Sequence, residues 1–328
     1  MAGRTGSRHR GRTGRLVVEG QPGGHRRASA PGHAGDGRAA PAAHRRYASR
    51  WLARFEPPGS RRHLPAGPTP PLTAVRRVVA PNAGPYTGPG TNTWIVEAGP
   101  VVAVIDPGPD DDRHLQALNQ KLAGATVGVV LVTHSHPDHL PLAERFARPH
   151  HASVRRYPEL GDGDVVRVGT LNVTALHTPG HSADHLCFWL AGDGAMFTGD
   201  LILGRGSSMV TYPEGDVAAY LRSLDRLAEL KPRMLFPGHW DPVTGAMAKI
   251  AGYRAHRLER EAQVLAEIRR GRGTAHELTR RVYGTELEDR LRVAAEMTLR
   301  AHLRKLVDDG AVRVRGTGGE EVYEPTVS

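Results

Sequence analysis

The chain has 328 residues, of which 39% are hydrophobic, enough for one full-sized domain and a smaller one. No run of about 18 apolar residues occurs, which excludes a membrane-spanning helix and gives no reason to expect a membrane partner. Cys187 is the single cysteine, which excludes disulfide frameworks, cysteine-based zinc fingers and iron–sulfur clusters. Together with the lack of a secretory signal, it indicates a cytoplasmic protein.

The formal net charge of +10 originates almost entirely in the N-terminal tract. Residues 1–70 contain 14 arginines, no lysine and three acidic residues, a net charge of +11, so the remaining chain carries −1. The tract is rich in Gly, Pro, Ala and Arg and lacks apolar periodicity, so we predict a disordered extension over residues 1–72. Choice of an upstream start codon is one origin for such an extension, and a nucleic-acid-binding tail is the alternative. The overall charge alone does not identify a nucleic-acid partner.

Residues 73–250 alternate short apolar runs with turns and amphipathic segments. The runs predict strands over Val101–Ile105, Val127–Thr133, Val165–Val168, Leu171–Leu176, Leu186–Leu190, Ala195–Phe197 and Met234–Phe236. Helical spacing predicts helices over His114–Leu122 and Val217–Leu230. Because some strands follow one another directly and others are separated by helices, we predict a mixed α/β layered domain whose strand ends offer loops for a site.

Residues 251–328 have the character of charged helices followed by two short strands. The apolar positions are Leu258, Ala262, Leu265 and Ile268 on a first helix and Leu291, Ala295, Leu299, Leu303 and Val307 on a third. A second helix is predicted over Ala275–Tyr283 with Thr274 as its N-cap, and Gly310 ends the third. Ala311–Arg315 and Glu321–Tyr323 predict a two-stranded wing, so this region is predicted to form a small winged-helix-like domain.

Four metal-capable side chains lie within six residues directly after the Val127–Thr133 run: His134, His136, Asp138 and His139. His134 and His136 are two residues apart, so they project to the same side of an extended chain. Asp138 and His139 are adjacent and do not easily join that pair on one small ion. The spacing therefore predicts two metal ions side by side, with more ligands from other strand ends.

Three downstream segments meet that expectation, each after an apolar run. They are His177-Thr178-Pro179-Gly180-His181, Phe197-Thr198-Gly199-Asp200 and Pro237-Gly238-His239. Each places a histidine or an aspartate beside glycine, where the backbone can approach a ligand closely.

Taken together, these segments resemble the metallo-β-lactamase superfamily, whose pattern is His-x-His-x-Asp-His followed by a separate His, an Asp and a last His. The resemblance covers about residues 75–250 and implies an αβ/βα sandwich, here with the winged-helix-like domain behind it. It implies His134, His136 and His181 as ligands of a first ion, Asp138, His139 and His239 as ligands of a second, and Asp200 as the bridge. Asp106 matches an acidic residue that supports the site in this family without ligating.

The ligand types favour two Zn²⁺ ions, and iron or manganese is also compatible with them. Two adjacent ions lower the pKa of a bridging water, supply hydroxide at neutral pH and polarise the scissile carbonyl or phosphoryl group, so we expect a metal-dependent hydrolase. Asp138 or Asp106 is expected to accept or relay a proton. His177 and His185 flank His181 and are interpreted as supporting or packing residues.

The substrate class stays open between RNA and thioesters. Asp200 argues against a true β-lactamase, which lacks the bridging acid, and the 38 residues between Asp200 and His239 are too few for an inserted β-CASP domain. The more specific resemblance is to the β-lactamase-like protein 2 group, which includes an endoribonuclease and ends in a winged-helix-like domain. Its supporting stretches are Gly90–Trp94, His181–His185, Thr198–Gly204 and Pro237–His239, and it extends over about residues 78–315.

The group resemblance implies cleavage of single-stranded RNA. Arg290, Arg300, Arg304 and Lys305 on the third C-terminal helix could contact phosphates, although charged helix faces are ordinarily only solvated. The alternative is a thioesterase acting on acyl-carrier, coenzyme A or glutathione thioesters, because such hydrolases share this metal site. The expected substrate is thus a small-molecule ester or thioester, or single-stranded RNA, and the oligomeric state is left open. A transcriptional regulator is disfavoured, since it has no need of seven ligands.

Overall fold

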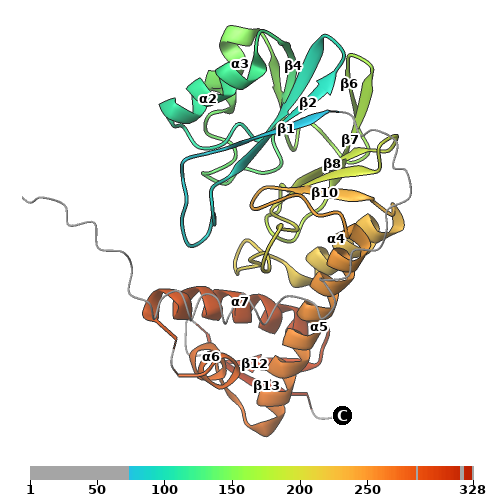
Figure 1. Cartoon of the computed structure of the whole chain (residues 1–328). Helices are drawn as coiled ribbons and strands as arrows, with labels where there is room; N and C mark the ends of the chain where they lie inside the picture. Colours follow the sequence, from blue (N-terminus) through green and yellow to red (C-terminus); the bar gives the residue numbers. More distant parts are fainter. Residues whose placement is uncertain (1–73, 286, 318–320, 327–328) are drawn as a thin grey trace, which may run out of the picture. The chain divides into compact units, whose positions relative to one another are not determined.

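The structure, a computed structural model, describes residues 74–285, 287–317 and 321–326, with the side chains of all of these except residues 289 and 290. Two five-stranded sheets form the centre of the larger domain (Figure 1). The first has the order β1-β2-β3-β4-β5, formed by Val75–Val79, Asn92–Ala98, Val101–Ile105, Thr126–Leu131 and Ser153–Arg155. The second has the order β10-β9-β8-β7-β6, formed by Met234–Pro237, Ala195–Gly199, Leu186–Leu190, Leu171–His177 and Val165–Val168. The extension predicted over residues 1–72 lies outside the described residues.

Helices cover the outer faces of both sheets. Against the first sheet pack α2 (Asp112–Leu122) and α3 (Ala143–Ala147), which continues into the 3₁₀ helix η1 (Arg148–His150). Against the second pack α4 (Val217–Glu229) and the beginning of α5 (Ala246–Arg270). Both faces of the central strands are therefore buried, which explains why strands such as β8 and β9 read as continuous apolar runs. The predicted αβ/βα sandwich is confirmed.

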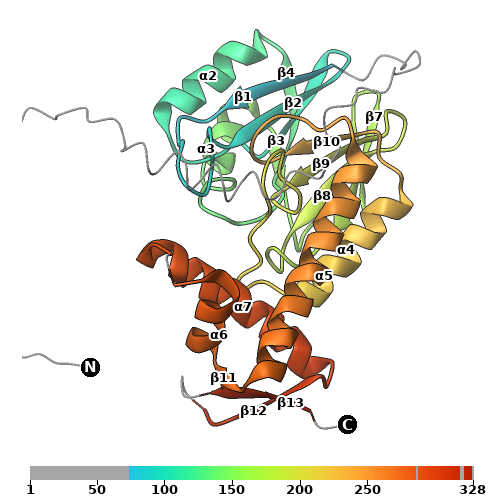
Figure 2. The same ribbon diagram turned by 60° about the horizontal axis from the view of Figure 1, so that its bottom comes forward.

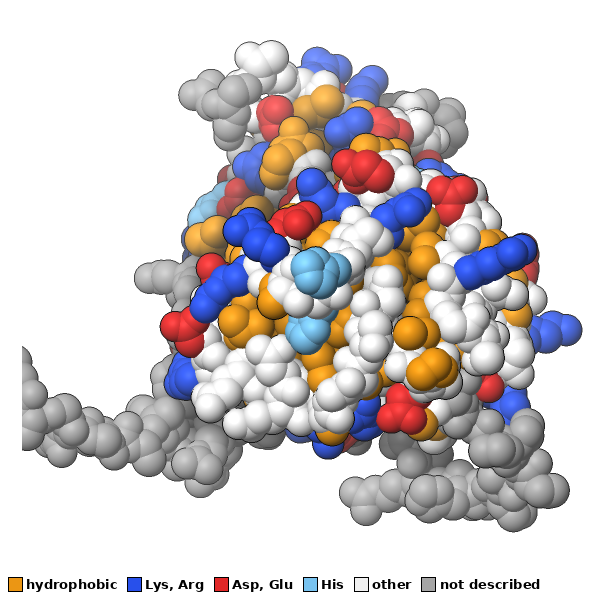
Figure 3. Space-filling view, turned by 90° about the horizontal axis from the view of Figure 1, so that it is seen from above, with side chains coloured by type: hydrophobic (Ala, Val, Ile, Leu, Met, Phe, Trp, Pro, Cys, Tyr) orange, Lys and Arg blue, Asp and Glu red, His pale blue; other side chains and the backbone are white. Residues whose placement is uncertain are grey.

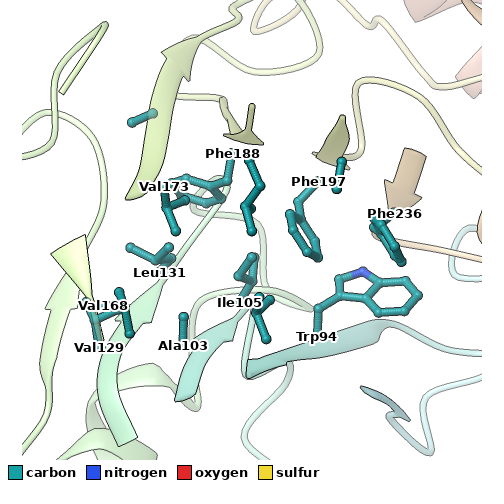
Figure 4. Packing of buried hydrophobic residues seen from close by; sticks show 14 of the residues in the cluster. Trp94, Ala103, Ile105, Val129, Leu131, Val168, Val173, Phe188, Phe197 and Phe236 are labelled. Atoms are coloured by element: carbon teal, nitrogen blue, oxygen red, sulfur yellow. The ribbon is translucent and has the colours of Figure 1, made fainter. Parts of the chain in front are cut away.

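The core between the two sheets has an aromatic group at its centre. Trp94 of β2 in the first sheet packs edge-on against Phe236 of β10 at a ring-centroid distance of 5.1 Å, and Phe236 stacks on Phe197 of β9 at 4.9 Å (Figure 4). Offset-stacked and edge-to-face pairs are the favoured aromatic geometries. These contacts fix the relative position of the strands whose ends supply the functional loops.

Most predicted strands agree with the observed ones, and β3, β6 and β8 have the predicted bounds. The strands β1, β2 and β5 were not predicted. Strand β2 begins with the polar residues Asn92 and Thr93, which are fully buried here because their side chains bond to backbone carbonyls of Pro237 and Asp106. Strand β4 ends at Leu131, so His134 lies in a loop and not at an extended strand end.

The C-terminal region contains α5, α6 (Ala275–Tyr283), α7 (Asp289–Asp308) and a small sheet. Thr274 caps α6 through a capping box with Glu277, as the N-cap prediction required. The predicted two-stranded wing has a third strand: β13 (Val322–Pro325) lies between β12 (Val312–Arg315) and β11 (Gly273–Thr274). The predicted winged-helix-like domain is confirmed with this correction.

The apolar stripe predicted for the first C-terminal helix is wrong in its first half. Leu258 is 38% exposed, whereas the neighbouring Arg257 is 2% exposed. Figure 2 shows α5 running from beside α4 to the small sheet, and the helix therefore serves two cores. It contributes Ile250 and Tyr253 to the cluster around α4 and Val264 and Ile268 to the C-terminal cluster, so one stripe cannot describe it.

The predicted domain boundaries, at residues 72/73 and 250/251, stay predictions, and the second falls inside α5. Among the described residues, no helix is long and apolar enough to cross a membrane.

Candidate metal centre

All seven residues predicted as ligands gather at one edge of the two sheets, because each follows the end of a strand. His134, His136, Asp138 and His139 lie in the loop after β4; His181 follows β7, Asp200 follows β9 and His239 follows β10. Within this set, ligand atoms lie within 4.8 Å of one another in three groups: His134 with His136 and His181, His134 with His139 and Asp200, and Asp138 with His139 and His239.

The first cluster consists of three imidazoles whose nitrogens converge. Nδ1 of His136 lies 3.0 Å from Nε2 of His134 and 3.1 Å from Nε2 of His181. Donor atoms bound tetrahedrally to zinc at about 2.0–2.1 Å lie about 3.3 Å apart. The three nitrogens therefore have a spacing that one small metal ion would satisfy.

The second cluster combines two histidines with carboxylates. Oδ2 of Asp138 lies 3.2 Å from Nε2 of His239 and 3.4 Å from Nε2 of His139. Asp200 connects the clusters: its Oδ1 lies 3.3 Å from Nε2 of His239, and its Oδ2 lies 3.8 Å from Nε2 of His181. One carboxylate thus presents a different oxygen to each cluster, which is the geometry of a bridge.

Hydrogen bonds to Nδ1 fix the ring orientation of four of the five histidines. Nδ1 of His139 donates to Asp106 at 2.9 Å, that of His181 to the Met209 carbonyl at 2.7 Å, and that of His239 to the Gly90 carbonyl at 3.2 Å. His134 donates through Nδ1 to Oγ1 of Thr133, which itself donates to Asp106.

These bonds leave Nε2 of all four rings directed into the clusters, as partners of metal-binding histidines ordinarily do. His136 is the exception, since its Nδ1 faces the first cluster and its Nε2 lies 3.3 Å from Glu214.

The protonation states suit a cation site. Burial, reinforced by neighbouring imidazoles, holds the pKa of His134 well below its ordinary value. In the second cluster burial opposes ionisation, but His139 and His239 outweigh it and lower the pKa of Asp138. Burial also lowers the pKa of His239, yet Asp200 and Asp138 together raise it to about 9. The carboxylates are thus ionised, and a bound cation would take the place of the protons that they favour on His139 and His239.

Buried polar atoms without partners show that the residues present fit a metal. Nε2 of His139 and Oδ1 of Asp200 are buried and make no hydrogen bond in the described structure, although they lie 3.5 Å from each other. Buried polar atoms without a hydrogen bond are costly unless a ligand satisfies them. Gly238 has no side chain and therefore leaves space beside these atoms. A Cβ at this position would lie 2.5 Å from Oδ1 of Asp200 and 2.8 Å from Cε1 of His139. The donor set, its spacing and its orphaned atoms all suit a divalent cation.

Asp106 and the flanking histidines surround this centre without entering it. Both oxygens of the Asp106 carboxylate already accept hydrogen bonds. Oδ1 accepts from the Thr133 amide at 2.7 Å, and Oδ2 accepts from Thr133 Oγ1 and His139. His177 donates from Nε2 to the Ala183 carbonyl and stacks on Tyr157. His185 is fully buried beside His134, with Nδ1 3.0 Å from Oγ1 of Thr178.

Several residues around the clusters were not identified from the sequence. Asp184 joins two of the loops, since it accepts from the Ser135 amide at 2.9 Å and from the Ser182 hydroxyl at 2.8 Å. Its place inside the His181–His185 segment could have singled it out. Ser208 and Glu214, on the loop before α4, carried no such signal, because their roles depend on where that loop folds.

A sandwich of two sheets between helices, with a histidine–carboxylate site at one edge, defines a class of metal-dependent hydrolase folds. The metallo-beta-lactamase superfamily model matches residues 86–162 and 154–239, and the model of the beta-lactamase associated winged helix domain matches residues 274–320.

Two curated relatives and one solved structure extend this similarity. The atrochrysone carboxyl ACP thioesterase of Aspergillus chevalieri is 34% identical over 295 residues, covering 82% of this chain and 92% of the relative. The beta-lactamase-like protein 2 homolog of Caenorhabditis elegans is 29% identical over 259 residues, covering 73% and 86%. The crystal structure of a metallo-beta-lactamase family protein from Thermus thermophilus, 24% identical, superposes with a TM-score of 0.65 over 77% of this chain and 98% of that one. The chain belongs to the metallo-beta-lactamase superfamily and is a hydrolase-fold member with a C-terminal winged-helix domain.

Proposed function

We propose that this protein is a metal-dependent thioesterase that hydrolyses an acyl thioester, with an acyl group on an acyl carrier protein as the preferred substrate class. The observation that carries the hydrolytic part is Asp200, whose two oxygens face the two clusters. In this proposal His134, His136 and His181 hold one ion, Asp138, His139 and His239 hold the other, and both ions are Zn²⁺.

Bound ions would supply an activated water and polarise the carbonyl of the substrate. The exposure of the two acidic residues indicates which one can accept a proton. The side chain of Asp138 is 23% exposed, whereas that of Asp106 is 2% exposed and its carboxylate is already filled by Thr133 and His139. We therefore assign proton acceptance to Asp138 and ring positioning to Asp106, which narrows the prediction that either could relay a proton.

The thioester substrate is supported by the thioesterase relative, whose similarity extends over 92% of its length. The other reading, RNA cleavage, follows from the resemblance to the β-lactamase-like protein 2 group, a homolog of which is 29% identical to this chain, and was also supported by a basic face predicted for α7. Three of its four residues are paired within their own domain: Arg300 with Glu296 at 2.9 Å, Arg304 with Asp308 at 3.1 Å, and Lys305 with Glu261 at 2.9 Å. The side chain of Arg290 lies outside the described residues. Paired cations release few counterions on binding a phosphate backbone, which disfavours RNA.

The surface charge of another face of the molecule also gives no support for RNA binding. Lys and Arg side chains are interspersed there with Asp and Glu side chains, and no patch of one sign covers it (Figure 3).

The cytoplasmic localisation expected from the single cysteine stays a prediction.

The experiment offers the zinc-loaded protein a panel of acyl thioesters, on acyl carrier protein, coenzyme A and glutathione, beside labelled single-stranded RNA. Thiol release measures hydrolysis of the first three and gel electrophoresis measures the last. We expect turnover of acyl thioesters, fastest on the carrier protein, and its loss in His134→Ala and Asp200→Ala. His150→Ala is the control, because His150 contacts Asn119 and lies away from the clusters.

Cleavage of RNA without thioester turnover, abolished by a chelator and by Asp200→Ala, would replace this proposal with the endoribonuclease. Metal analysis of the purified protein, by elemental counting per chain, distinguishes two zinc ions from iron or manganese.

A further inference from the structure

Arg257 is a buried cation in the part of α5 between the two cores of the chain. It is 2% exposed, and its Nε is buried without a hydrogen-bond partner. It lies outside both regions matched by the family models, which end at residue 239 and begin again at residue 274. Arginine stays charged in proteins. Burying a charge among neutral groups costs free energy, so packing alone does not explain an arginine at this position.

The guanidinium contacts the loop that lies between Asp200 and α4. Nη2 donates to the Ser208 carbonyl and lies 3.4 Å from Oγ of Ser207. The group also lies over the ring of Tyr220, 5.0 Å from its centroid. Arg257 thus joins α5 to the loop and to α4 at one point.

That loop orients two of the residues proposed as ligands. The carbonyl of Met209, one residue beyond the arginine contact, accepts the Nδ1 hydrogen bond of His181 at 2.7 Å. The hydroxyl of Ser208 donates to the backbone carbonyl of Asp200.

Tyr220 provides a second route to the same two residues. Its hydroxyl donates to the carbonyl of Leu201, which follows Asp200. Its backbone also packs against Gly180, which precedes His181, so closely that a Cβ on Gly180 would lie 2.5 Å from the Tyr220 nitrogen.

We propose that Arg257 is a positioning residue for the first metal cluster: it holds the 207–209 loop in the position that orients the ring of His181. The inference rests on the proposed metal centre and not on its substrate. Through this loop, α5, the helix that leads into the winged-helix domain, would affect metal binding. It also predicts a selective effect, because the loop holds the ring of His181, which only the first cluster contains, whereas it contacts Asp200 at the backbone carbonyl and not at the bridging carboxylate.

The test measures Zn²⁺ affinity by competition with a chromophoric chelator in two single-cluster backgrounds. His239→Ala leaves the first cluster complete, and His181→Ala leaves the second complete. In the first background Arg257→Met should weaken Zn²⁺ binding about tenfold, the lower end for loss of a group that supports a ligand; in the second the change should stay within about twofold. Arg254→Met is the matched control on the same helix, since Arg254 pairs at the surface with Asp225, and it should change neither affinity.

Equal weakening in both backgrounds, or none in the first, would overturn the proposal. Arg257→Lys keeps the cation but replaces the planar guanidinium with a single ammonium, so it should give an intermediate affinity, and it decides the question if the methionine variant does not fold. Far-UV circular dichroism and the melting temperature check folding of each variant. If the wild-type protein binds no Zn²⁺, the metal centre itself is wrong, whereas failure on thioesters leaves this test unaffected.

Discussion

Asp106 Oδ2 accepts a hydrogen bond from Nδ1 of His139 at 2.9 Å, and both side chains are almost completely buried. Asp106 reaches this position from a left-handed backbone conformation, with φ of 52°. A non-glycine residue in that region carries strain that is retained mostly at functional positions. The carboxylate thereby faces both the histidine ring and Thr133, which supports the His134 ring from the other side.

Asp106→Asn should weaken metal binding about 10–100-fold, because the amide is a poorer acceptor for Nδ1 of His139 and Thr133. The measurement is the Zn²⁺ affinity by chelator competition, together with the zinc content after dialysis. Asp110→Asn is the control, since Asp110 lies four residues away and pairs at the surface with Arg145. Unchanged zinc affinity in the Asp106 variant would show that the His139 ring needs no such support.

Gly238→Ala should abolish metal binding while the domain stays folded. The new methyl carbon would lie 2.5 Å from Oδ1 of Asp200 and 2.8 Å from Cε1 of His139, closer than real Cβ contacts allow. Gly252→Ala is the matched control, because nothing lies within 4 Å of its Cβ position in α5. That substitution should keep full zinc content and raise the free energy of unfolding by about 0.5–1 kcal/mol, since alanine favours a helix over glycine. Normal zinc content in Gly238→Ala would mean that the close approach is not required.

The gathering of the seven proposed ligands could be predicted from sequence, because each follows an apolar run and buried strands end at a common edge of a sandwich. Their division between two ions came from the family resemblance and stays a proposal. His134 and Asp200 come from different sheets, yet their positions relative to strands β4 and β9 were sufficient. Asp106 was expected to support the site from the family resemblance, but the supporting residues on the loop before α4 could not be predicted. Met209 holds His181, and Ser208 binds Arg257, through backbone carbonyls of an irregular loop, and such carbonyls have no signature in residue type.

In the C-terminal helices, too, local features could be predicted from the sequence and features set by tertiary contacts could not. The capping residue Thr274 predicted the start of α6, because a capping box is a local interaction. Burial along α5 was predicted incorrectly, since it depends on two separate cores and on the choice of Arg257 over Leu258 as the buried residue. Hydrophobic periodicity cannot identify a buried cation, whose environment is set by tertiary contacts.

Cys187 should be unreactive in the folded protein. The thiol is fully buried, and burial raises its pKa to about 12, so almost no thiolate exists near neutral pH. A chromogenic disulfide reagent at pH 8 should therefore detect no thiol in the native protein and one per chain in denaturant. Rapid labelling of the native protein would contradict the packing of β8 in this structure.

His256 should make the protein less stable as the pH falls. Burial, with the cations of Arg257 and Arg260, lowers its pKa to about 3 in the folded state, whereas an unfolded chain titrates near 6.5. Because the unfolded state binds the extra proton between these values, the free energy of unfolding is retained above about pH 6.5 and falls as the pH drops towards about 3. His256→Gln removes this proton site, so urea unfolding of the metal-free protein at pH 7, 6 and 5 should show a shallower loss of stability than in the wild type. His276→Gln, at an exposed position on α6, changes one histidine without touching α5 and supplies the control. A loss in His256→Gln as steep as that of the wild type would mean that the acid sensitivity has another origin.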